Sequence, residues 1–364
     1  MSDLKSFDSW LTDSGPVALV IRERLSPVEG PDGVVFPATF AAGEDKSKFP
    51  GGYNIDVVSD GKNICLIDSV GSQANRIEPM FSSGEYAALV PQIVVKAGEK
   101  EINLLDAGHR AGDALVRCSG LKADLHSAFI SQLRGDAEPL ARIAPTSLVF
   151  GVWDSRDTQA KVPRLLASTI RAYDVRKLTR SAQYIPATEY VASELLDEPT
   201  DKKQKDAYAE RGFIHVPAAG AHGGVIADGG IRRDATLSLS ALRLLNAGKD
   251  AAKTLALRRY ILGLALTAIT KLPAGYLRQG CQLVADPDKP RVFEEVYPDG
   301  KRTPATVTHD SALAFAQAAA KAFGVGPGRT VDFDKSLAKQ DVGGEEGESS
   351  GGRPAKKVAK KAAR

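Results

Sequence analysis

Short apolar runs, separated by polar and glycine-rich stretches, dominate the N-terminal part of the chain. The runs at 17–24, 63–67 and 91–95 are brief and are flanked by turn-forming residues, a pattern that predicts strands. The stretch from Leu25 to Tyr53 is rich in glycine and proline and shows no hydrophobic period. We expect a long excursion loop there, because segments of this length without a period are usually functional or disordered loops.

A helix is predicted directly after the second of these strands. Asp68 or Ser69 can cap its start and Pro79 ends it, while Ala74 and Ile77 lie on one face. Further along the chain, helical periodicity or mixed helix and turn is predicted at 109–118, 124–144, 236–245, 251–271 and 310–323, with a long connection at 286–308.

The stretch 147–173 combines an apolar run, a polar turn and a second apolar segment. The run ends at Trp153, the turn is basic, and Pro163 is expected to open a helix. The apolar spacing predicts a core face of Leu165, Leu166, Thr169, Ile170 and Tyr173. A buried strand that delivers a cationic loop to a helix start can hold a phosphate backbone. The alternative is an ordinary connection with solvated charges.

A β-hairpin is predicted farther along the chain. Two apolar runs, Phe213–Val216 and Val225–Ala227, flank a tip of glycine, alanine, proline and histidine. Small residues at such a tip allow another backbone to approach closely, although a mobile surface hairpin without a role gives the same pattern. The charge-rich segment 194–211 before it predicts a solvated helix or linker.

Composition narrows the class of protein. The 364 residues are 43% hydrophobic, enough for one large elaborated domain or two smaller ones. The net charge is only +3, so any nucleic-acid contact depends on how the charge is distributed. The three cysteines, Cys65, Cys118 and Cys281, lie far apart, which disfavours zinc and disulfides and suits a reducing cytoplasm.

The ends of the chain and its most apolar segment give further expectations. The first residues lack the pattern of a signal peptide. The segment 260–269 is too short to span a bilayer and follows two arginines, so a core helix is predicted and no membrane partner is expected. From about residue 341 the chain becomes rich in glycine, serine and glutamate and then in lysine, which predicts a flexible basic tail.

Motifs of common catalysts are absent from the sequence. It contains no P-loop, no dinucleotide-binding glycine pattern, no H-E-x-x-H and no G-x-S-x-G. The five histidines are scattered without metal-ligand spacing. We therefore expect no metal, no cofactor and no enzymatic activity, and favour a binding or assembly role.

Arginine and amide side chains supply candidate nucleic-acid contacts. Gln73, Asn75 and Arg76 share the exposed part of the helix after Asp68, and amides beside an arginine suit hydrogen bonds to RNA. An ordinary amphipathic surface helix is the alternative. Arg110 and Arg117 align with Asp113 at helical spacing, either as a phosphate-facing pair or as a weak surface ion-pair ladder. Arg278 is expected to point outward.

Several segments together resemble one family. They are IDSVGSQANRIEP, HRAGDALVR, FGVWDSR with KVPRLLASTIRAYDV, RRDATLSLSALRLL and LRQGCQLV. They are similar to the RAMP-type backbone subunit of type I-U (I-G) CRISPR Cascade complexes. The similarity extends from about Asp68 to Val284.

The resemblance implies an α+β fold: a modified RRM-like (ferredoxin-like) palm with an antiparallel sheet, inserted helical finger elements and a thumb-like β-hairpin. A single domain is expected over residues 1–340, with insertions at about 25–62 and 194–233, followed by the tail at 341–364. The hairpin at 213–230 is the expected thumb. The RNA contacts expected from the resemblance and from residue chemistry are Gln73, Asn75, Arg76, Arg110, Arg117, Ser155, Arg156, Lys161, Arg164, Arg232, Arg233 and Arg278.

The resemblance also implies the partners. Copies of the subunit polymerise head-to-tail along the guide RNA (crRNA), grip its backbone and leave its bases free to pair with target DNA. The other partners are the large Cascade subunit and the RAMP subunits that cap the ends of the crRNA. A head-to-tail interface builds an open filament.

Two other hypotheses fit the sequence. The first is an RNA-processing endoribonuclease of the same superfamily that uses His109 or His222 as a general acid–base. The second is a metabolite-binding or scaffold protein whose charges are only solvated, for which RNA affinity would not fall as salt rises.

Overall fold

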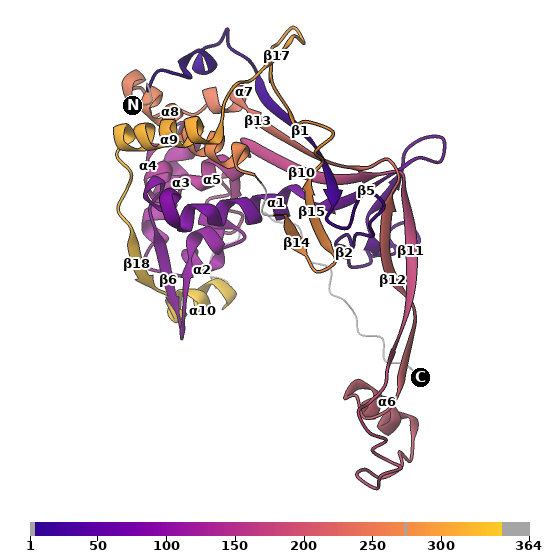
Figure 1. The fold of residues 1–364 in the computed structure, drawn as a ribbon. Coiled ribbons are helices and arrows are strands. Elements are labelled where there is room, and N and C mark those ends of the chain that lie inside the picture. Colours follow the sequence, from indigo (N-terminus) through magenta and orange to yellow (C-terminus); the bar gives the residue numbers. More distant parts are fainter. Residues whose placement is uncertain (1–3, 273–274, 344–364) are drawn as a thin grey trace.

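The computed structural model describes residues 4–272 and 275–343, and it has a mixed α+β fold built on one curved antiparallel sheet (Figure 1). The strands pair in the order β14-β15-β1-β13-β10-β5-β4, and β16 pairs with β1 and with β17. Strand bounds are Ala18–Pro27 (β1), Ile55–Val57 (β4), Asn63–Asp68 (β5), Leu166–Tyr173 (β10), Ile231–Ser238 (β13), Tyr276–Arg278 (β14), Cys281–Ala285 (β15), Val292–Val296 (β16) and Arg302–Pro304 (β17).

Alternation along the central strands separates an apolar face from a polar one. Leu19 and Ile21 of β1 lie opposite Leu237 and Ala235 of β13, and all four are buried in the main core. The neighbouring residues on these strands, Val20, Arg22 and Thr236, turn to the opposite face, because side chains alternate along a strand. One face therefore packs on helices while the other presents polar side chains.

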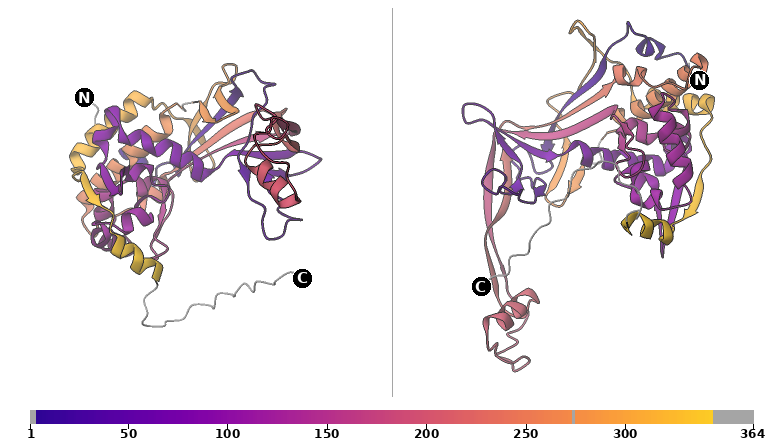
Figure 2. Two further views of the ribbon diagram at one scale, coloured as in Figure 1. Left: turned by 90° about the horizontal axis from the view of Figure 1, so that it is seen from below. Right: turned by 180° about the vertical axis from the view of Figure 1, so that it is seen from behind.

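A helical body covers the apolar face at one end of the sheet (Figures 1 and 2). The α-helices are Val70–Ile77 (α1), Ala114–Arg117 (α2), Lys122–Leu133 (α3), Glu138–Ile143 (α4), Thr146–Phe150 (α5), Leu239–Arg243 (α7), Ala251–Thr270 (α8), His309–Phe323 (α9) and Lys335–Gly343 (α10). Short 3-10 helices lie at Asp8–Leu11 (η1), Glu78–Ser82 (η2), Gly84–Leu89 (η3), Leu104–Asp106 (η4) and Arg110–Gly112 (η5). The second half of α8 is buried on all sides, so this helix is the centre of the body.

Close packing joins α8 to α9. A Cβ on Gly263 would lie 2.8 Å from the Cα of Ala316, so only glycine allows this approach. Nearby, the rings of Tyr260 and Phe323 stack with their centroids 4.7 Å apart. No helix among the described residues combines the length and the apolar character that crossing a membrane requires.

Three small sheets lie outside the main sheet. Strand β6 (Ile93–Ala97) pairs with β7 (Lys100–Asn103) and, in parallel, with β18 (Arg329–Asp332). The other two sheets pair β2 (Thr39–Phe40) with β3 (Gly52–Tyr53) and β8 (Val152–Trp153) with β9 (Lys161–Val162).

A long β-hairpin projects from the far end of the sheet, away from the helical body (Figures 1 and 2). Its strands are β11 (Val175–Tyr184) and β12 (Val216–Ala227), and they connect β10 to β13. The tip between them carries α6 (Lys202–Glu210), none of whose residues is buried.

Several predicted elements are confirmed. The strands at 17–24, 63–67 and 91–95 correspond to β1, β5 and β6. The helix after Asp68 is α1, capped by Ser69, and the helices at 251–271 and 310–323 are α8 and α9. The loop expected after Leu25 is largely irregular, with β1 continuing to Pro27 and two-residue strands later.

The prediction for 147–173 is wrong in both halves. Residues 146–150 form the short helix α5, and the expected helix after Pro163 is the strand β10. The burial of β10 alternates over most of its length, and pairing with β5 and β13 on its two edges outweighs the helical spacing of its leucines.

Three further predictions are corrected. The helix expected at 236–245 is the end of β13 followed by α7. The arginine ladder does not exist, because Asp113 caps α2 and separates it from η5. The hairpin predicted within 213–227 is one continuous strand, β12, whose partner is β11, so the turn lies at 185–215 instead. The connection at 286–308 contains the β16–β17 pair.

The predicted division into one domain and a tail stays a prediction. Residues 341–343 end helix α10, and the rest of the predicted basic tail lies outside the described residues.

Candidate nucleic-acid interface

Helix α1 holds the first group of predicted contacts. The hydroxyl of Ser69, directly after β5, accepts a hydrogen bond from the backbone N–H of Ser72 at 3.2 Å and caps the helix. The cap fixes where each later side chain emerges. Asn75 and Arg76 are exposed as expected, but the prediction for Gln73 is wrong, because its side chain is buried between Asp68 and Ser168.

The carboxylate of Asp68 orients three of the predicted residues. It is fully buried and accepts hydrogen bonds from Gln73 Nε2 at 2.7 Å, Arg76 Nε at 3.2 Å and Arg278 Nη2 at 2.8 Å. Gln73 in turn accepts from the Ser168 hydroxyl at 2.9 Å. Two guanidiniums share one carboxylate, so the cluster keeps one positive charge in excess. The expectation that Arg278 points outward is wrong, since its guanidinium turns to Asp68.

Arg110 links α1 to the loop after α5. Its Nη2 donates to Asn75 Oδ1 at 3.2 Å and its Nη1 to the carbonyl of Gly151 at 3.4 Å. Its Nε lies 2.6 Å from Oε2 of Glu78, an ion pair without hydrogen-bond alignment. Burial raises the pKa of Glu78 to about 7 despite this arginine. The Arg110 guanidinium is buried, so it connects elements instead of facing solvent.

Arg164 continues this chain of contacts. Its Nε donates to the carbonyl of Phe150 at 2.8 Å, and the backbone of Gly151 lies against it. Burial, and to a lesser degree the charge of Arg110, lowers the pKa of Arg164. The side chain remains partly exposed, so it can still reach a phosphate.

The β8–β9 hairpin carries the remaining loop residues. Buried Asp154 accepts from the backbone N–H and the hydroxyl of Thr158, at 2.9 and 2.6 Å, which closes the turn. Arg156 is exposed on this turn and Ser155 is partly buried. The Lys161 ammonium lies 5.7 Å from the centre of the Trp153 ring.

Three predicted contacts are held in ion pairs with acidic residues. Arg117 is paired with Asp341 at 2.8 Å. Arg232 is paired with Asp234 on the polar face of the sheet. Arg233 is only 2% exposed, and its Nε lies 2.7 Å from Oε2 of Glu23, also buried. The structure thus links the residues of α1, Arg110, Arg164 and Arg278. Arg233 lies beside α1, and Arg117 lines a small pocket with Asp154 and Asp157 of the hairpin, whereas Arg232 lies on the opposite face of the sheet from Arg233.

A cavity of about 520 Å³ opens beside α1. The charged residues that line it are all basic: Arg76, Arg233 and Lys271. Its walls are otherwise Gln73, Asn75, Ile77, Pro79, Met80, Ala268, Leu272, Gly275, Tyr276 and Leu277. Lys271 was not predicted as a site residue, and its only signal in the sequence was its place at the end of a clearly predicted helix. Asp68 was predicted only as a possible helix cap.

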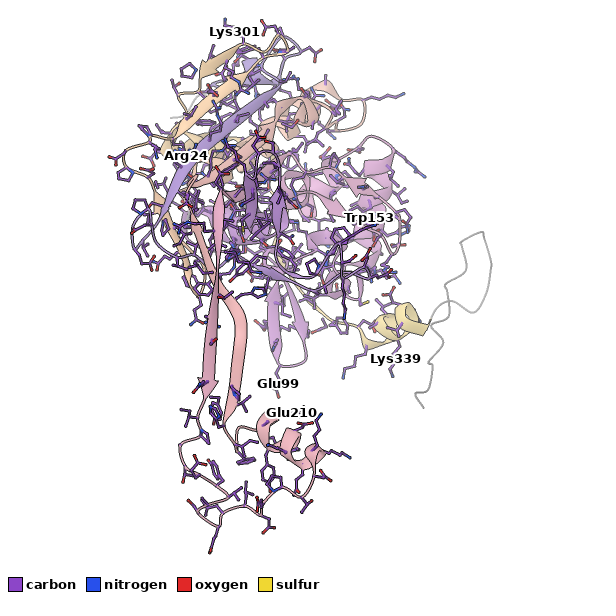
Figure 3. All side chains as sticks on the ribbon, turned by 90° about the vertical axis from the view of Figure 1, so that its right-hand side faces the viewer. Arg24, Glu99, Trp153, Glu210, Lys301 and Lys339 are labelled. Carbon is purple, nitrogen blue, oxygen red and sulfur yellow. The ribbon has the colours of Figure 1, made fainter. Side chains whose placement is uncertain are left out.

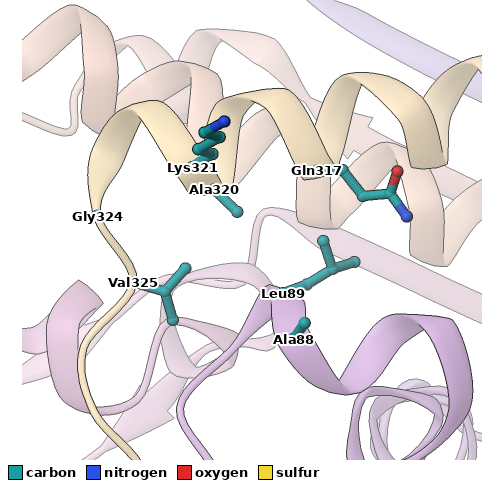
Figure 4. A pocket seen from close by; sticks show the side chains of 7 residues that line it. All are labelled: Ala88, Leu89, Gln317, Ala320, Lys321, Gly324 and Val325. Atoms are coloured by element: carbon teal, nitrogen blue, oxygen red, sulfur yellow. The ribbon is translucent and has the colours of Figure 1, made fainter.

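A second pocket and the two histidines proposed for a nuclease show no arrangement typical of a catalytic site. A pocket of about 350 Å³ between α9 and η3 is lined by one charged residue, Lys321, among mainly small and apolar ones (Figure 4). Of the proposed nuclease histidines, His109 is exposed at the start of η5, and His222 packs on Tyr53 with ring centres 4.7 Å apart. Among the described residues, no three histidine, cysteine or acidic side chains are grouped to hold a metal ion.

One family model matches part of the chain. Residues 19–177 match the family model described as CRISPR-associated protein GSU0053. The matched segment runs from β1 to the start of β11 and includes Asp68, α1 and the β8–β9 hairpin. No curated protein matches the chain. The match covers less than half of the chain, and it shows that residues 19–177 are similar to a CRISPR-associated family of Cas7-like structural subunits.

Proposed function

We propose that this chain is a non-catalytic backbone subunit of a type I-U (I-G) Cascade complex, which holds the guide RNA by its sugar–phosphate backbone. The observation that carries the proposal is the convergence of cationic and amide groups from α1, β14 and the loop 151–164. Buried acceptors, chiefly Asp68, hold these groups in place. A subunit that accepts any guide sequence needs such contacts to phosphates and 2′-hydroxyls and leaves the bases free.

Electrostatics support this role. Arg156, Lys161 and Arg164 have no ion pair with a carboxylate among the described residues, so their charges are available to phosphates. A net charge of +3 is sufficient, because many copies share one RNA and each neutralises only a few phosphates.

The strand order supports an RRM-like palm. The strands β1, β10, β13 and β15 follow one another along the chain in that order. In the sheet they lie side by side in the order β15-β1-β13-β10. Helices α1 to α5 lie between the first and second of these strands, and α7 and α8 between the third and fourth. This is the arrangement of a β-α-β-β-α-β ferredoxin-like unit. The β11–β12 hairpin forms the connection between β10 and β13, the second and third strands of this unit along the chain. We therefore assign this hairpin as the thumb.

Assembly follows from the same proposal. Copies would polymerise head-to-tail along crRNA in the cytoplasm, beside the large subunit and the end-capping subunits, with target DNA bound through the guide. Within the predicted site, Arg110 and Arg233 act as buried structural residues. The proposed contacts are made by exposed Asn75, Arg76, Arg156 and Lys161, with partly exposed Arg164 and Arg278.

A double substitution tests the proposed grip. Arg156→Ala with Arg164→Ala should weaken RNA retention to a similar degree for every guide sequence. It should also reduce the slope of log affinity against log salt by about 1.4, since each single-strand phosphate contact contributes about 0.7. Binding is measured by fluorescence anisotropy on RNA-free protein over a range of salt.

The matched control is Arg134→Ala with Lys249→Ala, which also removes two exposed charges but lies outside the interface. Co-purification from cells that contain the CRISPR array gives a second measurement, with RNA of one size class expected. An unchanged salt slope in the double variant, or a loss restricted to particular sequences, would contradict a backbone grip.

A further inference from the structure

The two tryptophans of the chain have opposite environments. Trp10 is 6% exposed and stacks on Phe7 with ring centres 4.7 Å apart. Trp153 is 58% exposed, although it lies in a short paired strand. Figure 3 shows it at the surface of the helical body, apart from Glu210 at the tip of the long hairpin. So large an aromatic surface left in water is costly unless a partner covers it.

The backbone beneath Trp153 is held firmly. Asp154 closes the turn through its two hydrogen bonds from Thr158. Gly112 packs so tightly that an added Cβ would lie 2.9 Å from the Trp153 carbonyl oxygen. The ring is therefore presented by a fixed support, which lowers the entropy lost when a ligand covers it.

The charges around the ring are unbalanced in one direction. Both acidic residues of the turn are engaged, Asp154 with Thr158 and Asp157 with His126 Nδ1 at 2.8 Å. Arg156 and Lys161 have no carboxylate partner among the described residues, and Lys161 lies over the Trp153 ring. An exposed aromatic ring flanked by free cations is the arrangement that stacks a base and holds its phosphates.

We propose that Trp153 is a stacking platform for one base of a single-stranded nucleic acid, with Arg156 and Lys161 contacting the adjacent phosphates. The proposal rests on the proposed function and adds a residue that grips a base instead of the backbone. Trp153 is two residues from Gly151, whose carbonyl contacts Arg110, and two residues span about 7 Å at most. One strand can therefore reach both places. Guide RNA and single-stranded DNA share this chemistry.

Tryptophan fluorescence tests the proposal directly. RNA-free protein is titrated with a uridine oligonucleotide and, separately, with a thymidine oligodeoxynucleotide. Stacking on Trp153 should quench its emission, whereas the Trp153→Phe variant, which keeps only buried Trp10, should show no change. The strand that quenches identifies the source of the base.

Affinity separates stacking from apolar contact. Trp153→Phe keeps an aromatic face, so its affinity for a labelled oligonucleotide should stay close to that of the original protein. Trp153→Leu removes the face and should weaken binding by about 5- to 160-fold, the range found when a single base stack is lost. Circular dichroism checks that both variants are folded.

The outcomes distinguish this inference from the function on which it rests. If the oligonucleotides bind but Trp153 emission is unchanged and Trp153→Leu binds as well as the original, the stacking inference is overturned and the backbone grip stands. If no oligonucleotide binds, the proposed function itself fails. If Trp153 emission instead shifts with protein concentration in the absence of nucleic acid, the ring is a protein contact and the inference is overturned.

Discussion

The buried ion pair between Arg233 and Glu23 makes the clearest prediction. The two residues lie directly opposite each other on β13 and β1, and their side chains are 2% and 3% exposed. Sequence position suggested that Arg233 contacts RNA, but its place in the sheet suggests a structural role. Arg233→Met should therefore lower stability and should not act selectively on RNA binding.

The expected loss can be worked out from this geometry. Arg233→Met leaves the Glu23 carboxylate buried and without its partner at 2.7 Å, which costs about 3–5 kcal/mol. At about 2.1 cal/mol/K per residue, unfolding of the described residues has an entropy of about 0.7 kcal/mol/K, so the midpoint should fall by about 4–7 °C. The double variant Glu23→Leu with Arg233→Met removes both charges and should recover most of the loss.

Thermal and urea unfolding followed by circular dichroism measure this effect. Arg232→Met is the matched control, since Arg232 is the adjacent residue on the opposite face and is paired with Asp234 in a partly exposed position. Its loss of stability should stay within about 1 kcal/mol, and its RNA affinity should stay unchanged. The structural assignment of Arg233 would be refuted if Arg233→Met kept its midpoint and lost RNA, or if the double variant were less stable than either single variant.

Two further predictions concern Glu78 and Gly151. Because the pKa of Glu78 is raised to about 7 in the folded protein, its contribution to stability is greatest below the unfolded value near 4.5 and is lost as pH rises towards 7. The free energy of unfolding should fall by about 3 kcal/mol over that window relative to Glu78→Gln, and identical pH profiles for the two proteins would contradict this. Gly151 has φ of +78° and an added Cβ would lie 3.1 Å from the backbone nitrogen of Arg164. Gly151→Ala should lower the free energy of unfolding, measured in urea, by about 1–3 kcal/mol. The control is Gly61→Ala, because Gly61 has a similar φ of +75° but open space around it, and its loss should be smaller. An equal loss in the two variants would show that the close approach at Gly151 is unimportant.

Local signals were enough for part of the interface. Ser69 follows a short apolar strand and precedes amphipathic spacing, so strand, cap and helix α1 could all be predicted. Helix α8 was predictable for the same reason, because its apolar pattern is long and bounded by Asp250 and Lys271. Such signals act between residues a few positions apart and need no knowledge of the rest of the chain.

Strand β10 shows where local signals fail. Its leucines and Ile170 fit a helical stripe, yet Ile170 lies opposite Arg233 on one side and Asp68 on the other. Those partners are distant in the chain, and their hydrogen bonds decide the conformation. The same holds for the long hairpin, since β11 and β12 are separated by the whole tip.

The linear chain determined the short strands, the capped helices, the cluster of cations near Trp153 and a resemblance that the family match supports. Only the tertiary structure decided which arginines face solvent. Arg232 and Arg233 are neighbours of the same chemistry, but alternation along β13 sends one to the polar face and buries the other against Glu23. Burial and ion pairing depend on residues that are remote in sequence, so a guanidinium's availability to RNA is a property of the folded protein.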